Sequence, residues 1–234
     1  MGLPFFNDFS GGKYAMNLLR LFAVAGVCAG LGAGASAATI GGIDFPDGPI
    51  SFADSVVSYN PGGGFTGTGV CQDSSKAVGI PNFTGGDCDG YVSLGQGGSI
   101  VLQFTDNALT TSGDSSADLH VFEIGAAVEA MLISISTNAV DWIDLGRLSG
   151  QPTSIDIDGV AGVVSGAAYS YVRIIDDPNS GPSGGVYSGA DIDAVGAISS
   201  TAPVTPVPLP ATGLMLVGAL GALASAKRRK RKQS

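Results

Sequence analysis

The segment Gly98-Ser99-Ile100-Val101-Leu102-Gln103-Phe104 alternates large apolar side chains with other residues along its length. Successive side chains of an extended chain point to opposite faces, so Ile100, Leu102 and Phe104 share one face. This pattern predicts a strand that buries one face in a hydrophobic core. No long stretch of the mature chain shows helical periodicity, and the strand pattern therefore decides the fold class.

Short segments of the same kind lie on both sides of this strand. Residues 118–124 carry apolar side chains on both faces, which is typical of a central strand. Short strands separated by Gly, Asp and Ser turns are typical of antiparallel sandwiches. We therefore expect an all-β fold, a jelly-roll-like antiparallel β-sandwich over residues 38–199. The other expected strands are 50–52, 55–59, 131–136, 142–145, 154–157, 169–175 and 192–198.

The C-terminal residues 207–234 have a different composition, and a Pro-rich stem (200–206) precedes them. Residues 209–226 carry no charge, and as a helix with 1.5 Å rise per residue they would nearly cross the ~30 Å hydrocarbon core. Basic residues beside a membrane span stay cytoplasmic, so we expect a C-terminal transmembrane helix with the rest of the chain outside. The basic residues of this tail are Lys227, Arg228, Arg229, Lys230, Arg231 and Lys232.

A short motif opens this C-terminal stretch. Together with the short span and basic tail it resembles the VPLPA-CTERM variant of the PEP-CTERM sorting domain of Gram-negative bacteria. The resemblance implies processing by an exosortase-type enzyme and delivery to the cell surface. Residues 209–213 also match the LPxTG signal of sortase substrates, and a plain membrane anchor would have the same geometry. The motif consists of Val207, Pro208, Leu209, Pro210 and Ala211.

The N-terminus has the three parts of a secretory signal peptide. Met16 opens a positively charged segment, an apolar run follows at 21–31, and Ala35 and Ala37 form an A-x-A cleavage site. We predict that residues 1–37 are a signal peptide read by Sec-type export machinery, with Met16 as a candidate start. Export and the C-terminal signal place the domain at the cell surface or in the extracellular space.

The segment between the two signals is strongly acidic. The whole chain has a net charge of −9, but residues 38–206 hold 19 acidic residues against only Lys76, Arg147 and Arg173. Such a surface repels nucleic acids, favours cations and keeps an exported protein soluble. We expect no nucleic-acid partner.

Two cysteines remain after the signal peptide is removed. Cys71 and Cys88 form an even pair in an oxidising compartment, where disulfides persist. We predict that they form a disulfide, which would stabilise the fold by roughly 3 kcal/mol.

Several carboxylates lie near predicted strands and their ends. Asp191 and Asp193 are two residues apart and share a strand face. Carboxylates and backbone carbonyls are the ligands that Ca²⁺ prefers, so these residues are candidate calcium ligands. The alternative is that they are turn residues or partners of Arg173, and Asp156 with Asp158 is interpreted as an exposed polar edge. The candidate calcium ligands are Asp118, Glu123, Asp176, Asp191 and Asp193, with Asp177 beside them.

No pattern of catalytic residues stands out. His120, the only histidine, lies in a predicted strand and is interpreted as structural, and no serine lies in a G-x-S-x-G motif. No carboxylate pair can be singled out for glycoside hydrolysis. We therefore expect no enzymatic activity. A candidate sugar-stacking platform consists of Trp142, Tyr169, Tyr171 and Tyr187.

The order of the strand segments over about 100 residues looks like a β-sandwich module of bacterial cell-surface proteins, of the jelly-roll or galactose-binding-like kind. The phrases that carry the resemblance are 98–104, 118–123, 171–176 and 189–195. Such modules have a Ser-x-Asp-Gly turn before Trp, where this chain has Asn138-Ala139. The resemblance implies a binding or matrix role in the envelope, with extracellular polysaccharide as a candidate partner; a glycan-active enzyme is the alternative.

Overall fold

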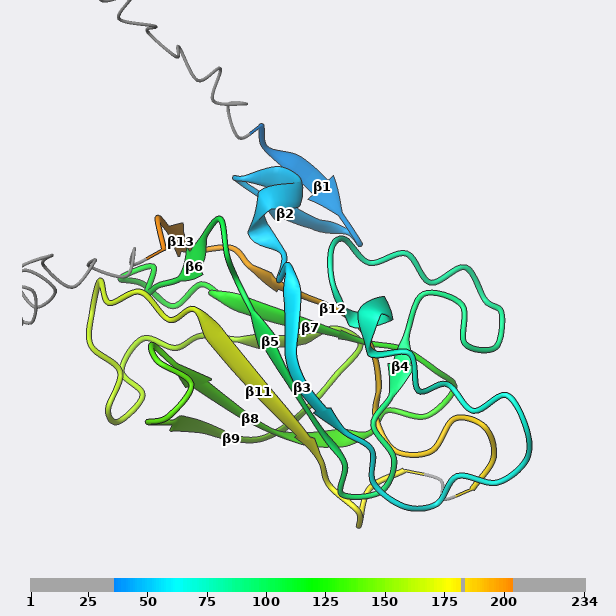
Figure 1. Ribbon diagram of the computed structural model, residues 1–234. Coiled ribbons are helices and arrows are strands. Elements are labelled where there is room, and N and C mark those ends of the chain that lie inside the picture. Colours follow the sequence, from blue (N-terminus) through cyan, green and yellow to red (C-terminus); the bar gives the residue numbers. More distant parts are fainter. Residues whose placement is uncertain (1–35, 182–183, 204–234) are drawn as a thin grey trace, which may run out of the picture. The chain divides into compact units, whose positions relative to one another are not determined.

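The computed structural model describes residues 36–181 and 184–203, whose regular structure is mostly antiparallel β-sheet (Figure 1). This confirms the all-β prediction. One sheet has the strand order β10-β7-β12-β4 and the other β3-β5-β11-β8-β9. The first sheet consists of β10 (Thr153–Ile155), β7 (Leu119–Glu123), β12 (Asp191–Ala197) and β4 (Val92–Ser93). The second consists of β3 (Ser55–Asn60), β5 (Ser99–Gln103), β11 (Tyr171–Asp176), β8 (Ala130–Ser136) and β9 (Ile143–Ser149).

Both sheets contribute to one hydrophobic core. In β5 and β11 buried and partly exposed residues alternate, and Ile100, Leu102 and Phe104 are fully buried, as the alternating pattern predicts. They belong to the same cluster of apolar side chains as Val121 of β7 and Val195 of β12. Burial of this shared apolar surface is the main force that holds the two sheets together.

An N-terminal hairpin explains why β7 and β12 are buried along their whole length. Strands β1 (Ala38–Ile40) and β2 (Ile43–Phe45) pair through a tight turn at Gly41 and Gly42, both with positive φ. Phe45 packs with Phe52, Phe122 and Ala194 in a second apolar cluster. Because this cluster covers the other face of β7 and β12, those strands need apolar residues on both faces.

The structure differs from the prediction at residues 50–52, where a strand was expected. Residues Gly48–Ser51 form the 3₁₀ turn η1, and only Phe52 makes an isolated β-bridge, with Gly196. Pro49 at the start of this turn fixes φ and lacks the N–H that a strand ladder needs, which favours the turn. A second 3₁₀ turn, η2, spans Ser74–Ala77.

The predicted signals fall almost entirely outside the described residues. This holds for most of the signal peptide, including Ala35, and for the C-terminal motif, the expected transmembrane helix and the basic tail. Within the described residues no helix is long and apolar enough to cross a membrane. The short strand β13 (Ser200–Thr201) pairs with β6 (Ala108–Leu109), so sheet pairing extends into the region expected to be the stem.

Candidate functional site

Strand β7 separates the acidic residues into two groups, one at each of its ends. Asp118 directly precedes the strand and Glu123 is its last residue, which places them about 16 Å apart at ~3.3 Å per residue. The five predicted calcium ligands therefore do not form one site. Asp118 lies at one end, and Glu123, with Asp176 and Asp191 near it, lies at the other.

The first group, which we call the aspartate trio, consists of Asp118, Asp156 and Asp158. Each offers a carboxylate oxygen within 4.8 Å of the others, the only such convergence of three acidic, Cys or His side chains in the described part of the chain. Asp156 and Asp158 directly follow β10. The sequence pattern placed them at an exposed edge, and the antiparallel pairing of β10 with β7 brings them to Asp118.

Hydrogen-bond donors of the chain already occupy the aspartate trio. The two oxygens of Asp118 accept from the backbone N–H groups of Ser112 (2.8 Å) and Ile157 (3.0 Å). Asp158 accepts from the Gly113 N–H (2.8 Å) and from the Ser112 hydroxyl (2.9 Å). The trio thus ties the loop before β7 to the segment after β10, and this structural role accounts for its residues.

Asp191 of the second group lines a cavity of about 450 Å³, which we call the pocket. Three segments form it: the loop 83–87 with Tyr91, the loop 124–129, and the approach to β12. This volume lies in the range of small-molecule sites, roughly 300–1,000 Å³. Three aromatic rings and three carboxylates line it, and they belong to Phe83, Tyr91, Tyr187, Asp87, Glu129 and Asp191.

The disulfide and a buried aspartate hold the aromatic wall of the pocket. Cys71 and Cys88 are bonded with a Cα–Cα distance of 4.8 Å, which confirms the predicted disulfide. The Tyr91 hydroxyl lies 3.5 Å from Cys71 Sγ, and the ring of Tyr91 packs edge-on against Phe83 with centroids 5.6 Å apart. Asp193, a predicted calcium ligand, instead accepts from the backbone N–H groups of Asn82 (2.9 Å) and Phe83 (3.2 Å).

The carboxylates of the pocket lack the donors that the aspartate trio has. Glu129 and Asp191 are 5% and 7% exposed, and Glu123, behind them, is 2% exposed. Both carboxylate oxygens of Glu123 are buried without a backbone N–H or hydroxyl donor among the described residues, and the carboxyl groups of Glu123 and Glu129 contact each other. Asp191 accepts from the Ser93 hydroxyl. Among the described residues Glu123 and Glu129 therefore have no positively charged partner, which is costly unless a proton or a ligand compensates.

Burial and mutual repulsion shift the titration of these groups. Desolvation, with Glu129 beside it, raises the pKa of Glu123 to about 10, and desolvation raises the pKa of Asp191 to about 7. The pKa of Glu129 is raised by desolvation, and that of Asp176 is raised by desolvation despite N–H donors from Gly97 and Ala190. Glu123 is thus protonated at neutral pH. Such perturbed groups in a cavity mark candidate functional sites.

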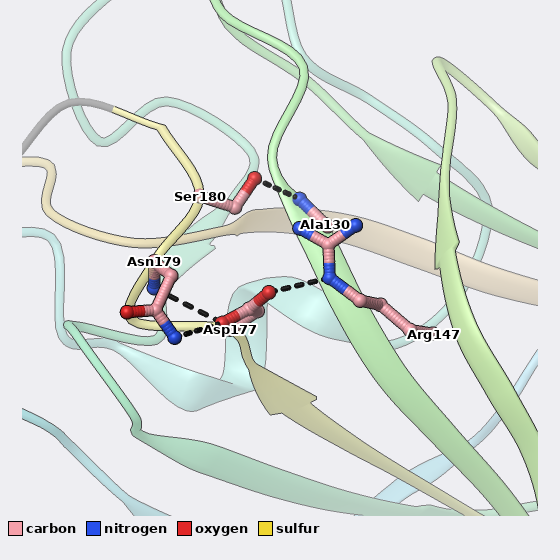
Figure 2. A network of polar contacts seen from close by, with 5 residues as sticks. All are labelled: Ala130, Arg147, Asp177, Asn179 and Ser180. Atoms are coloured by element: carbon pink, nitrogen blue, oxygen red, sulfur yellow. Dashed lines mark hydrogen bonds and ion pairs between the residues drawn. The ribbon is translucent and has the colours of Figure 1, made fainter.

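A polar network beside the pocket fixes the segment that packs on Glu129 (Figure 2). Asp177 pairs with Arg147 and accepts from the N–H of Asn179, while the N–H of Ala130 donates to the Ser180 hydroxyl at 2.7 Å. The next residue, Gly181, has a φ of +74° and lies so close that a Cβ there would be 2.4 Å from Cγ of Glu129. Glycine is required here for both reasons.

Other predicted site residues lie away from the pocket. Trp142 packs under the guanidinium of Arg173 at 4.5 Å, and Arg173 pairs with Asp144 at 3.7 Å rather than with Glu123 or Asp193. Tyr169 is 2% exposed. Of the four aromatic residues of the expected sugar-stacking platform, only Tyr187 lines the pocket, so the platform is not assembled as predicted.

His120 is 5% exposed, and its Nδ1 lies 3.0 Å from the Ser154 hydroxyl. Burial lowers the pKa of this histidine. Its surroundings agree with the structural role inferred for it.

Sequence reasoning missed Glu129 and the aromatic residues Phe83 and Tyr91. Glu129 lies in a loop without periodicity, and no local signal identifies it. Tyr91 follows Cys88 by three residues, so the predicted disulfide was the one available clue to its place. No protein-family model, curated protein or solved structure matches the chain. The function must therefore be inferred from the chemistry of the site.

Proposed function

We propose that the protein is an exported, surface-sorted β-sandwich protein of the cell envelope or extracellular matrix, that it is not an enzyme, and that it binds extracellular polysaccharide in the pocket. The observation that carries the binding role is the pocket itself, a cavity of about 450 Å³ that combines three aromatic rings with the buried carboxylates of Glu129 and Asp191. Carboxylates accept hydrogen bonds from sugar hydroxyls, and aromatic rings pack on the apolar faces of sugars. Such a mixture of apolar walls and few polar groups is typical of ligand sites.

Location outside the cytoplasm is supported by the disulfide between Cys71 and Cys88. The signal peptide, the exosortase-type processing of the C-terminal motif and the membrane helix are parts of the same proposal. Mass spectrometry of the exported protein tests them together. We expect an N-terminus at Ala38 and a C-terminus near the motif; a C-terminus at Thr212 would favour sortase instead.

Calcium remains a proposed cofactor, and the aspartate trio is where it would bind. Its oxygen donors fit the preference of Ca²⁺. The oxygens of Asp118 both accept N–H groups already, so Asp156 and Asp158 would supply the free ligand atoms. The ion would then strengthen a connection that hydrogen bonds already make.

One observation favours a second candidate function, a glycan-active hydrolase. The carboxyl of Asp191 has a pKa of about 7, and Glu129 lines the same cavity, so one group could serve as acid and the other as base. Release of reducing sugar from exopolysaccharide by the wild type, and its absence in Glu129→Gln, would show an enzyme.

A binding assay separates the proposals. The full-length protein and the variant Tyr187→Ala are applied to an array of bacterial polysaccharides. We expect retention of one or a few polysaccharides by the wild type and at least tenfold weaker binding by the variant, because Tyr187 is the most exposed ring of the pocket. Absence of binding to every polysaccharide would contradict the proposed function.

A further inference from the structure

The pocket has an unusual charge balance for a site that would bind neutral sugars. All charged side chains that line it are acidic: Asp87, Glu129 and Asp191. The nearest ion pair, between Arg147 and Asp177, is taken up in the network of Figure 2 beside the pocket. A neutral hydroxyl would supply a hydrogen bond to these carboxylates but would leave their charge uncompensated in a buried place.

Glu129 is the strongest indication of a missing positive partner. It lines the cavity and is 5% exposed, and its hydrogen-bond contacts are the carboxyl of Glu123 and its own backbone, neither of which brings a positive charge. The neighbouring carboxyl of Glu123 is 2% exposed and protonated at neutral pH, so it can share a proton with Glu129 but supplies no positive charge. An ammonium group at this point would supply both hydrogen bonds and charge, and charge-assisted bonds are about twice as strong as neutral ones.

The aromatic rings favour an organic cation. Phe83, Tyr91 and Tyr187 line the same cavity, and the electron-rich face of an aromatic ring attracts a cation. A metal ion fits less well. In the described chain only the aspartate trio brings three carboxylate oxygens within 4.8 Å of one another, and the pocket carboxylates do not converge in this way. The cavity of about 450 Å³ also exceeds what a single ion needs.

The loop 124–129, which forms one side of the pocket, is fixed by hydrogen bonds from a residue outside the cavity. The side-chain amide of Gln151 donates to the backbone carbonyls of Gly125 (3.2 Å) and Ala127 (3.0 Å), so the loop is held from outside the cavity. Gly125, with a φ of +125°, brings the backbone next to Asp191, and a Cβ there would lie 3.7 Å from the Asp191 carboxylate. The backbone of this loop is thus held in place before any ligand arrives.

We infer that the pocket selects a sugar carrying a free amine, with Glu129 and Asp191 binding the ammonium group and the aromatic rings packing on the sugar ring. This inference rests on the proposed polysaccharide binding and names the chemical class of the unit that is recognised. An N-acetylated or purely hydroxylated sugar has no positive charge for the two carboxylates.

Isothermal titration calorimetry of the full-length protein with three probes tests this inference. The probes are glucosamine, N-acetylglucosamine and glucose, which share one ring and differ in the charged group. We expect glucosamine to bind at least tenfold more tightly than either neutral sugar. The comparison uses only the wild type, so it does not depend on the folding of any variant.

Two variants locate the selectivity. Glu129→Gln keeps the shape of the side chain and removes its charge, and we expect it to lower glucosamine affinity at least tenfold while changing N-acetylglucosamine affinity less than twofold. Asp156→Asn, at the opposite end of β7, is the matched control and should leave both affinities unchanged. Thermal unfolding of each variant verifies that it is folded.

The other outcomes overturn the inference in distinguishable ways. Equal or tighter binding of the neutral sugars would remove the amine selectivity and leave the proposed function intact. Lysine and Ca²⁺ are titrated in addition as controls. Tighter binding of lysine than of glucosamine would indicate a protein partner, and displacement of glucosamine by micromolar Ca²⁺ would indicate a metal site. If no probe binds and the polysaccharide array is also empty, the proposed function fails as well.

Discussion

Both ends of strand β7 carry clusters of acidic residues, but the carboxylates at the two ends differ in their hydrogen bonding. At the start of the strand, backbone N–H groups and a hydroxyl occupy the oxygens of Asp118 and Asp158. At its end, the carboxyl groups of Glu123 and Glu129 contact each other, and both oxygens of Glu123 are buried without a backbone N–H or hydroxyl donor among the described residues. A carboxylate whose acceptors are filled by the chain stabilises the fold, whereas one without donors costs stability until a proton or a ligand compensates it. Composition alone cannot separate these roles; the donors around each group do.

The largest effect is expected at the start of β7, where the carboxylates accept hydrogen bonds from the chain. Asp118→Ala removes the acceptor of two buried N–H groups, those of Ser112 and Ile157, at a fully buried position. Each unsatisfied donor costs about 1–3 kcal/mol, so we expect the free energy of unfolding to fall by about 4 kcal/mol. Urea unfolding measures it. Asp118→Asn, which keeps one acceptor oxygen, should recover part of the loss. A loss below about 1 kcal/mol would mean that water replaces these bonds and that the two ends do not differ as described.

The second effect concerns the pocket wall. Replacing both Cys71 and Cys88 with Ser removes a cross-link whose sulfur lies 3.5 Å from the Tyr91 hydroxyl. We expect a loss of about 3 kcal/mol in the free energy of unfolding. Ligand binding in the pocket should weaken as well, because the disulfide supports Tyr91 and the loop with Phe83. Unchanged binding in the folded double variant would show that Asp193 alone holds that loop.

The fold was more predictable than the site because strand patterns are local and side-chain neighbourhoods are not. The alternation in 99–104 predicts the one buried face that β5 has, and 131–136 forms β8, where Ser134 and Ser136 of the polar face are buried as well. The hairpin β1–β2 has only three residues in each strand, too few for a pattern, although it covers a whole face of β7. Hydrophobic periodicity cannot detect a hairpin with strands this short.

The division of the acidic residues depends on which strands become neighbours. Glu123 comes near Asp191 because β7 pairs with β12 in a register that places Glu123 opposite Ile192. Asp118 comes near Asp156 because β7 also pairs with β10. Neither pairing can be inferred from the sequence of a single strand. The sequence therefore identified most of the acidic residues but could not sort them into two groups, and it gave no reason to include Glu129.

The third effect depends on pH and concerns the end of β7 where Glu123 lies. An unfolded glutamate ionises near pH 4.5, whereas the pKa of Glu123 is raised to about 10 in the fold. The folded state thus holds an extra proton between these values, and its stability falls as the pH rises through this window. Asp191 adds to the fall up to its pKa of about 7. We expect the free energy of unfolding without ligand to be lower at pH 8 than at pH 5.

Glu123→Gln is the matched variant for this pH effect, since it keeps the shape and cannot ionise. Denaturant unfolding at both pH values should show a flatter profile in the variant and a stability at pH 8 above that of the wild type. If the stability of the variant depends on pH as strongly as that of the wild type, Glu123 is not the group that causes the pH dependence.

The smallest effect tests calcium at the aspartate trio. A site of the extracellular type, with a Kd near 1 mM, would add about 1 kcal/mol to the stability at 5 mM Ca²⁺. The gain is small because hydrogen bonds already occupy both oxygens of Asp118. Thermal unfolding with Ca²⁺ should therefore show a modest rise in Tm in the wild type and none in Asp158→Asn, while Glu129→Gln responds like the wild type. A rise that disappears in Glu129→Gln instead would move the ion to the pocket and reverse the roles assigned to the two ends of β7. No rise in any variant would leave the trio as a purely hydrogen-bonded connection, which its geometry alone suffices to explain.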